Sequence, residues 1–360
     1  MSALINIAIF GIGNVGSTLI QQIASFNKRQ KLKSEEEPVL NVFAIANSTL
    51  ALFSHNALEN KWEADFESQS YPYTIEDVIA FAKANSLDNL LAVDVTASAD
   101  FVQNYIPLIE ANFHLVTANK IANTQSFAYY QKLRLALRSN KRHFQYETNV
   151  GAGLPVIETI KNLYQSGEEI HKIRGVFSGS LSYLFNTFSK EEKDFSEILL
   201  EADALGLTEP DAREDLSGKD VARKLLILGR EIGLESEFDD VKVQSLVPPE
   251  LNGHTTLPEF RESVKLLDGL FAINKKELAE NEVLRHVGEL NLQTNQLEVK
   301  LVKESKNTAL GQTRGADAVF EIYTASYGEQ PLVIQGAGAG KAVTARGVLG
   351  DILKVAQSLN

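Results

Sequence analysis

Residues 4–16 read LINIAIFGIGNVG, and this stretch decides the fold of the first part of the chain. Leu4 to Phe10 is a short apolar run of the kind that forms a buried parallel strand. Gly11, Gly13 and Gly16 follow at once, and apolar residues then recur at helical spacing. A strand, a glycine turn and a helix in this order are the context that the dinucleotide-binding fingerprint requires.

The residues of the turn would have different roles in that fingerprint. Gly11 would permit the tight turn, Gly13 would let the backbone approach a pyrophosphate, and Gly16 would let the helix pack close to the sheet. The helix that begins at Asn14 and Val15 would offer its first N–H groups to the anion. A purely structural glycine turn is the alternative interpretation.

The second predicted strand, Val39–Ala46, bears on which cofactor binds. NAD-binding proteins often carry an acid at the end of this strand, where it holds the ribose hydroxyls. Here Asn47 and Ser48 follow the strand, and the acids at 35–37 precede it. The missing acid allows a 2′-phosphate, although no arginine follows closely to hold one. On balance the sequence favours NADP over NAD.

Strands and helices alternate as far as residue 147. Further strands are predicted at 90–95, 114–117 and 143–146, and helices at 75–84, 100–111 and 127–137. This alternation predicts an α/β fold, a Rossmann-type doubly wound parallel sheet over residues 1–147. A charge-rich patch at 28–37, KRQKLKSEEE, is predicted to be a solvated loop.

Three polar residues would lie at the carboxyl edge of that sheet, where ligands bind in this architecture. Thr96 and Ser98 follow the strand at 90–95, and Lys120 follows the strand at 114–117. A turn or a helix cap is an equally good explanation for the two hydroxyls. The alternative for the lysine is an ordinary surface position.

The remainder of the chain predicts a second domain. Residues 148–335 are predicted to form an α+β domain, with alternating strand patterns at 283–302 and 319–325 that could pair with a partner subunit. Residues 336–360 carry a glycine cluster and an amphipathic helix that would return to the first domain.

Residues 208–231, TEPDAREDLSGKDVARKLLILGRE, mix acids and bases ahead of an apolar helix. The run at 210–215 is predicted to be a polar loop, and Asp215 or Ser217 would cap a helix that begins near Gly218. A helix advances roughly 100° per residue, so residues four apart lie on one face.

That spacing puts Asp220 and Lys224 together inside the apolar arc of the helix. Lys219, Arg223 and Arg230 would face solvent. One interpretation is an ordinary ion pair at the rim of a core helix. The other is an acid–base pair facing a small polar substrate, because a lysine held between burial and a carboxylate can deliver a proton to a reacting oxygen.

Residues 147–155 read ETNVGAGLP, and the two glycines predict an irregular backbone. Glu147 and several carbonyl groups could hold a hard monovalent cation. A plain hinge loop is the alternative.

Composition excludes several classes of function. The chain has 360 residues, which suits two domains, and its lack of cysteine excludes disulfides, thiolate metal sites and a cysteine nucleophile. A net charge of −12 argues against binding to nucleic acid or to anionic membranes. No signal peptide or apolar run of about 20 residues is present, so a cytoplasmic location is expected.

Several motifs together resemble homoserine dehydrogenase, and the resemblance covers essentially the whole chain in one order. They are GIGNVG, DVTAS, TANK, ETNVGAGLPVIE, FSGSLSY, LGLTEPDAREDLSGKDVARKLLILGRE and GAGAGKAVTARGVLGD. The similarity is to the monofunctional form, without the aspartate kinase half or the C-terminal regulatory domain that some members carry. Two departures are Ala212–Leu216, where the family often has PRDDL, and Lys219, which replaces a usual apolar residue.

The resemblance implies NAD(P)-dependent interconversion of L-homoserine and L-aspartate 4-semialdehyde, in threonine and methionine biosynthesis. It assigns Lys224 as proton donor and acceptor. It places Glu209 and Asp220 at the amino and hydroxyl end of the substrate, with Asp215 nearby. It also places Lys120 beside the nicotinamide and the substrate.

The resemblance further implies that Gly340 and Gly206 close over the cofactor. It maps a site for Na⁺ or K⁺ to Glu147 and the carbonyl groups of Val150, Ala152 and Leu154. Family members are usually dimers formed through a sheet of the second domain, so a homodimer is expected. Residues 148–335 would then be the substrate-binding and dimerisation domain.

Two other functions remain open on the sequence. The first is another Rossmann-fold dehydrogenase of a small amino or hydroxy acid, which would more often use a histidine base. The six histidines, among them His55, His114, His143 and His171, form no recognisable motif. The second is a protein that senses cofactor without turnover, which the Asp220 and Lys224 pair argues against.

Overall fold

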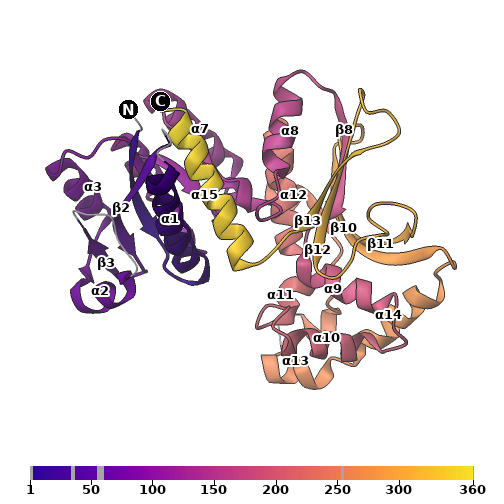
Figure 1. The fold of residues 1–360 in the computed structure, drawn as a ribbon. Coiled ribbons are helices and arrows are strands. Elements are labelled where there is room, and N and C mark those ends of the chain that lie inside the picture. Colours follow the sequence, from indigo (N-terminus) through magenta and orange to yellow (C-terminus); the bar gives the residue numbers. More distant parts are fainter. Residues whose placement is uncertain (1–2, 34–36, 55–60, 253–254, 360) are drawn as a thin grey trace. The chain divides into compact units, whose positions relative to one another are not determined.

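The structure is a computed structural model that describes residues 3–33, 37–54, 61–252 and 255–359 (Figure 1). His55 therefore lies outside the described residues. The chain forms two compact units, one of Met1–Gly153 with Gly340–Asn360 and one of Leu154–Ala339. The boundaries expected from the sequence are 147 and 336.

The first unit is built on a seven-stranded sheet with the order β4-β3-β2-β1-β5-β6-β7. The central strand β1 (Leu4–Phe10) pairs in parallel with β2 (Val39–Ala46) on one side and β5 (Leu90–Asp94) on the other. β6 (His114–Thr117) and β7 (Phe144–Gln145) extend the parallel sheet. The strand order reverses at β1, which creates the crevice where this architecture binds ligands. The Rossmann-type prediction is confirmed.

One edge of this sheet is not parallel, contrary to the prediction. β3 (Leu50–Phe53) pairs antiparallel with β2, and β4 (Tyr71–Pro72) pairs antiparallel with β3. The cause is a tight turn after β2, in which Asn47 Oδ1 accepts the N–H groups of Thr49 at 2.9 Å and Leu50 at 2.7 Å. An asparagine that bonds to the backbone ahead of it reverses the chain into a hairpin.

Two helices from opposite ends of the chain pack on one face of the sheet (Figure 1). α1 (Asn14–Lys33) and α15 (Lys341–Gln357) lie side by side over Ile5, Ile7 and Ile9 of β1. The sequence predicts a loop at 28–37, and this is wrong for residues 28–33, because α1 continues to Lys33. Residues 34–36 lie outside the described part of the chain.

The predicted helices at 75–84 and 127–137 correspond to α3 (Ile75–Ala84) and α7 (Phe127–Asn140). The predicted helix at 100–111 is two pieces, α4 (Ala99–Val102) and α5 (Tyr105–Glu110). The sequence did not predict α2 (Trp62–Gln69) or α6 (Ile121–Thr124).

The second unit contains a six-stranded sheet with the order β13-β12-β8-β10-β11-β9. Its strands are β8 (Ile170–Val176), β9 (Val241–Val243), β10 (Glu282–Asn291), β11 (Gln296–Ser305), β12 (Asp317–Thr324) and β13 (Leu332–Ala337). β8 pairs antiparallel with both β10 and β12 and is the centre of the sheet.

Helices cover this sheet and carry the second core. They are α8 (Val156–Gln165), α9 (Gly179–Phe188), α10 (Phe195–Ala204), α11 (Ala212–Leu216), α12 (Lys219–Glu231), α13 (Leu257–Ser263) and α14 (Leu266–Lys276). α9 and α12 both contact β10. Phe185, Phe195 and Phe271 are fully buried in the helical cluster beside the sheet. None of the helices described in either unit could span a membrane.

One buried histidine lies beneath α12. His286 on β10 is 2% exposed, and neither ring nitrogen has a hydrogen-bond partner in the described part of the chain. A Cβ atom at Gly218, just before α12, would be 3.5 Å from Cε1 of this ring. Burial lowers the pKa of His286 to about 4.

We expect this histidine to make folding sensitive to acid. Between about pH 6.5 and 4, His286 is protonated in the unfolded chain but stays neutral in the folded chain. The free energy of unfolding therefore falls as pH falls. The slope attributable to one such group is about 1.4 kcal/mol per pH unit. Denaturant unfolding of the His286→Leu variant should show a slope smaller by up to that amount. The matched variant His171→Gln, at a partly exposed histidine, should keep the wild-type slope, and an equal slope in His286→Leu would contradict the assignment.

Candidate active site

The glycine turn after β1 has the geometry that a pyrophosphate needs. Gly11 has a φ of +96°, and a Cβ atom at Gly16 would lie 1.9 Å from the Gly11 carbonyl oxygen, so only glycine lets α1 start this close. A Cβ atom at Gly13 would meet no described heavy atom within 4 Å, which leaves open space beside the turn. Asn14 and Val15 begin α1, whose first turn contains no acid to compete with an anion.

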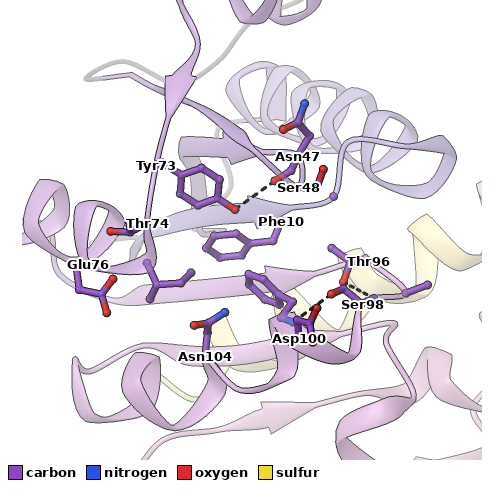
Figure 2. Close-up of a pocket in the computed structure, with 14 residues that line it drawn as sticks. Phe10, Asn47, Ser48, Tyr73, Thr74, Glu76, Thr96, Ser98, Asp100 and Asn104 are labelled. Carbon is purple, nitrogen blue, oxygen red and sulfur yellow. Dashed lines mark hydrogen bonds between the residues drawn. The ribbon is translucent and has the colours of Figure 1, made fainter.

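A cavity of about 550 Å³ lies beside this turn (Figure 2). Its walls come from the ends of β1, β2 and β5 and from the start of α3. Phe10, Ile75 and Phe101 give it apolar surfaces, and the hydroxyl of Tyr73 donates to the Asn47 carbonyl oxygen at 3.2 Å. A cavity that combines apolar surfaces with polar groups is typical of a small-molecule site.

Three of the predicted cofactor residues, Gly11, Thr96 and Ser98, line this cavity. Ser98 Oγ also accepts the N–H of Phe101 at 3.1 Å and caps α4, so the helix-cap interpretation of this serine is correct as well.

The sequence did not reveal the buried carboxylate that holds these turns together. Asp94 ends β5 and is 2% exposed. It accepts the hydroxyl of Tyr105 at 2.7 Å, the side-chain amide of Asn119 at 3.0 Å and the N–H of Thr96 at 2.8 Å. Burial raises the pKa of Asp94, and these hydrogen bonds oppose that rise.

Asn119 extends the same network to the cavity wall. Its amide also donates to the Ser98 carbonyl oxygen at 2.9 Å, while its own oxygen accepts the N–H of Ile121 at 3.1 Å. One buried side chain therefore joins the turn after β5 to the turn that carries Lys120. Lys120 itself is half-buried and precedes α6.

The second unit brings Asp220 and Lys224 together on α12. The Lys224 Nζ atom lies 2.7 Å from Asp220 Oδ2 and donates to the Phe177 carbonyl oxygen at 2.9 Å. The lysine side chain is 11% exposed and the aspartate 47%, so the ammonium lies at the boundary between core and solvent. Phe177 follows β8 directly, so the backbone at the end of a central strand holds the lysine from its other side.

Two more of the predicted acids lie beside this pair. Asp215 Oδ2 accepts the N–H of Glu209 at 2.8 Å. Burial raises the pKa of Asp215, the Glu209 N–H and the Ser180 side chain lower it, and the charges of Glu209 and Asp220 raise it further. Asp215 is therefore close enough to Glu209 and Asp220 to be influenced by both charges, and Ser180 near the start of α9 is a neighbour that the sequence did not point to.

Three local predictions for this stretch are wrong. Residues 212–216 form α11 within the predicted loop. The N-cap of α12 is Gly218, with a φ of +70° and no side-chain cap, in place of Asp215 or Ser217. Arg230 is buried because its guanidinium donates to the Ser236 carbonyl oxygen at 2.8 Å, in the loop after the helix. Lys219 and Arg223 are exposed as predicted.

The two glycines expected to close over the cofactor both have positive φ. Gly206 (φ +68°) follows α10 in the second unit, and Gly340 (φ +114°) precedes α15 in the first.

The segment expected to hold a cation begins with a buried acid. The N–H of Glu147 donates to Asp351 Oδ2 at 2.8 Å, and Lys354 Nζ lies 3.9 Å from the Glu147 carboxylate. Asp351 is itself 1% exposed. Lys354 Nζ also lies 3.8 Å from Asp351 Oδ1, so one ammonium group is near both acids.

The backbone after Glu147 is irregular. Gly151 and Ala152 have φ values of +79° and +53°, and Val150 is buried. Leu154 begins the second unit, and its carbonyl accepts the N–H of Val156 at 2.9 Å. Within the described ranges, no three His, Asp or Glu side chains converge as metal ligands.

Comparison with known proteins places both units in one family of sequences. The model described as "Homoserine dehydrogenase" matches residues 155–353, and "Homoserine dehydrogenase, NAD binding domain" matches residues 11–147. The homoserine dehydrogenase of Saccharomyces cerevisiae is 39% identical and is aligned over 99% of each chain.

Two further proteins are similar to this chain, one a longer bifunctional protein and one a protein with a crystal structure. The bifunctional aspartokinase/homoserine dehydrogenase of Haemophilus influenzae is 38% identical over 98% of this chain, which spans only 43% of that protein. A crystal structure of a Candida auris protein of unknown function superposes with a TM-score of 0.90 at 34% identity, covering 99% of each chain.

We expect the Asn119→Ala variant to lose both stability and cofactor affinity. It removes the amide that bonds to Asp94 and Ser98, so a buried carboxylate loses a donor, at a cost of about 1–3 kcal/mol. Denaturant unfolding and fluorescence titration with NADH would measure the two effects. The control Asn140→Ala, at the end of α7, should change neither by a comparable amount. Unchanged NADH affinity in Asn119→Ala would contradict the role of the network.

Proposed function

The chain belongs to the homoserine dehydrogenase family of oxidoreductases, and from that premise we propose that it interconverts L-homoserine and L-aspartate 4-semialdehyde. This reaction lies on the route to threonine and methionine. The observation that carries the proposal is the Lys224 ammonium, held between Asp220 and the Phe177 carbonyl oxygen at the edge of the core.

Lys224 is the proposed proton donor and acceptor. In the reducing direction its ammonium gives a proton to the aldehyde oxygen, and in the oxidising direction the neutral amine takes the proton of the substrate hydroxyl. The bound nicotinamide supplies or accepts the hydride. Asp220 orients the ammonium and stabilises its charge, because the two groups are 2.7 Å apart.

The charges of the substrate fit the groups around Lys224. Homoserine is a zwitterion, and Glu209, Asp215 and Asp220 offer carboxylates to its ammonium group. The substrate carboxylate would find N–H groups at the start of α9, which has ten residues and no acid in its first turn. Ser180 lies in that turn and beside Asp215.

In the first unit, we assign the pyrophosphate to the turn at Gly11, Gly13 and Gly16. Thr96, Ser98 and Lys120 would face the remainder of the nicotinamide cofactor, and Gly206 and Gly340 would close over it. The absence of an acid after β2 favours NADP, whereas the charges that line the cavity favour NAD.

We also propose a monovalent cation at Glu147 and the carbonyl groups of Val150 and Ala152, with Leu154 as the further carbonyl that the family resemblance implies. The buried carboxylate of Glu147 and the irregular backbone that follows it support a positive ligand there.

A homodimer formed through the sheet of the second unit is the proposed assembly, since β13 pairs with a strand on only one side within the described residues.

The Lys224→Met variant should lose at least about a hundredfold in kcat for homoserine oxidation, because general acid–base groups contribute about 10²–10⁴-fold. Its affinity for NADH should stay within about twofold. Reduced-cofactor absorbance and NADH fluorescence measure the two quantities. Lys219→Met, on the exposed side of the same helix, is the matched control and should keep wild-type turnover. Near wild-type turnover in Lys224→Met would remove the assignment.

Potassium or sodium should raise the melting temperature relative to choline at equal ionic strength, because a ligand of the folded state stabilises it. The Glu147→Gln variant should lose that increase, since it removes the charge at the proposed site. Glu67→Gln, an exposed position on α2, should retain it. If the wild-type protein melts at the same temperature in all three salts, no cation binds there.

A further inference from the structure

The cavity beside the glycine turn is negatively charged. Glu76 and Asp100 are among the residues that line it, and none of its fourteen described lining residues is lysine, arginine or histidine. Figure 2 shows Glu76 and Asp100 on different walls of the cavity. Its only charged side chains are therefore acids from two separate elements, the first turns of α3 and α4.

The position that distinguishes the two cofactors lies at the end of β2, where this fold holds the adenine ribose. Here Asn47 and Ser48 line the cavity. The Asn47 side-chain oxygen already accepts the N–H groups of Thr49 and Leu50. Ser48 is exposed and offers only a hydroxyl.

Cations are also rare in the sequence around this wall. From residue 39 to residue 100 the only basic side chains besides His55 are Lys61 and Lys83. Lys83 lies eight residues beyond Ile75, the first residue of α3, so it is about 12 Å away along that helix. It lines a separate cavity together with Arg142. Lys61 precedes α2, is exposed, and does not line the cofactor cavity.

We propose that this cavity selects NAD(H) over NADP(H). The proposal rests on the proposed function only for the class of cofactor. A 2′-phosphate brings a charge of about −1.5 to −2 and three strong acceptor oxygens, which proteins usually match with arginine or lysine. Here it would meet the Ser48 hydroxyl, in a cavity whose charged described lining residues are both carboxylates. The ribose hydroxyls of NAD bring no charge and suit Ser48 and the solvent beside it.

The acids also explain how NAD can bind without the usual acid after β2. Glu76 and Asp100 are acceptors, and the adenine amino group and ribose hydroxyls are donors. The absence of an acid after β2 removes one source of repulsion for the 2′-phosphate of NADP. Glu76 and Asp100 in the cavity lining add two other negative charges.

Binding of the reduced cofactors tests the proposal without turnover. Fluorescence titration of the full-length protein should give a Kd for NADH at least tenfold lower than for NADPH at 0.15 M salt. Raising the salt concentration should narrow the difference, because screening weakens the repulsion of the phosphate. Tighter or equal binding of NADPH, or NADPH binding that weakens steeply with salt as at a basic site, would overturn the proposal.

Variants at Ser48 and Lys61 test which residues set the affinity for NADPH. Ser48→Arg should tighten NADPH binding at least tenfold, and Ser48→Gln, which is long but uncharged, should not. Lys61→Met should leave the Kd for NADPH unchanged, and a tenfold increase would mean that Lys61 holds the phosphate and would overturn the proposal. Melting temperatures establish that each variant is folded.

Two outcomes distinguish an error in the proposed reaction from an error in the proposed preference for NAD(H). NADH binding without homoserine oxidation would remove the reaction and leave the preference standing. Homoserine oxidation that proceeds more efficiently with NADP than with NAD would keep the reaction and overturn the preference.

Discussion

An ammonium group at the edge of an apolar core is destabilising unless oxygen atoms contact it. Lys224 meets that requirement through Asp220 on its own helix and through the Phe177 carbonyl oxygen at the end of β8. The contact with Phe177 depends on α12 starting close to the sheet. Gly218 makes this possible, because a Cβ atom there would be 3.1 Å from Val243 and 3.3 Å from Val299.

In the first unit, a buried carboxylate is stabilised by hydrogen-bond donors in the same way. Asp94 is a buried carboxylate that remains tolerable because Tyr105, Asn119 and the Thr96 N–H all donate to it. A charge satisfied in this way fixes the groups that satisfy it. The turn after β5 and the turn that carries Lys120 are thereby held as one piece, and the cofactor cavity has one stable wall.

The local patterns could be predicted from the sequence, whereas partners distant along the chain could not. The strand, glycine turn and helix at 4–33 are set by residues within a few positions of one another, as is the contact between Asp220 and Lys224. The Asp94 network joins residues 11 and 25 positions apart, and no periodicity marks it. Arg230 was expected in solvent because a helical wheel cannot show the Ser236 carbonyl that the next loop brings to it. The cavity charge was missed for the same reason, since Glu76 and Asp100 come from elements other than β2.

Chemical rescue tests the central role of Lys224 most directly. In the Lys224→Ala variant, with saturating cofactor and homoserine, small primary amines should restore hydride transfer, at a rate that rises with amine concentration and depends on amine basicity. A rate that is already that of the wild-type protein without amine, or one that no amine changes although both ligands bind, would contradict the account.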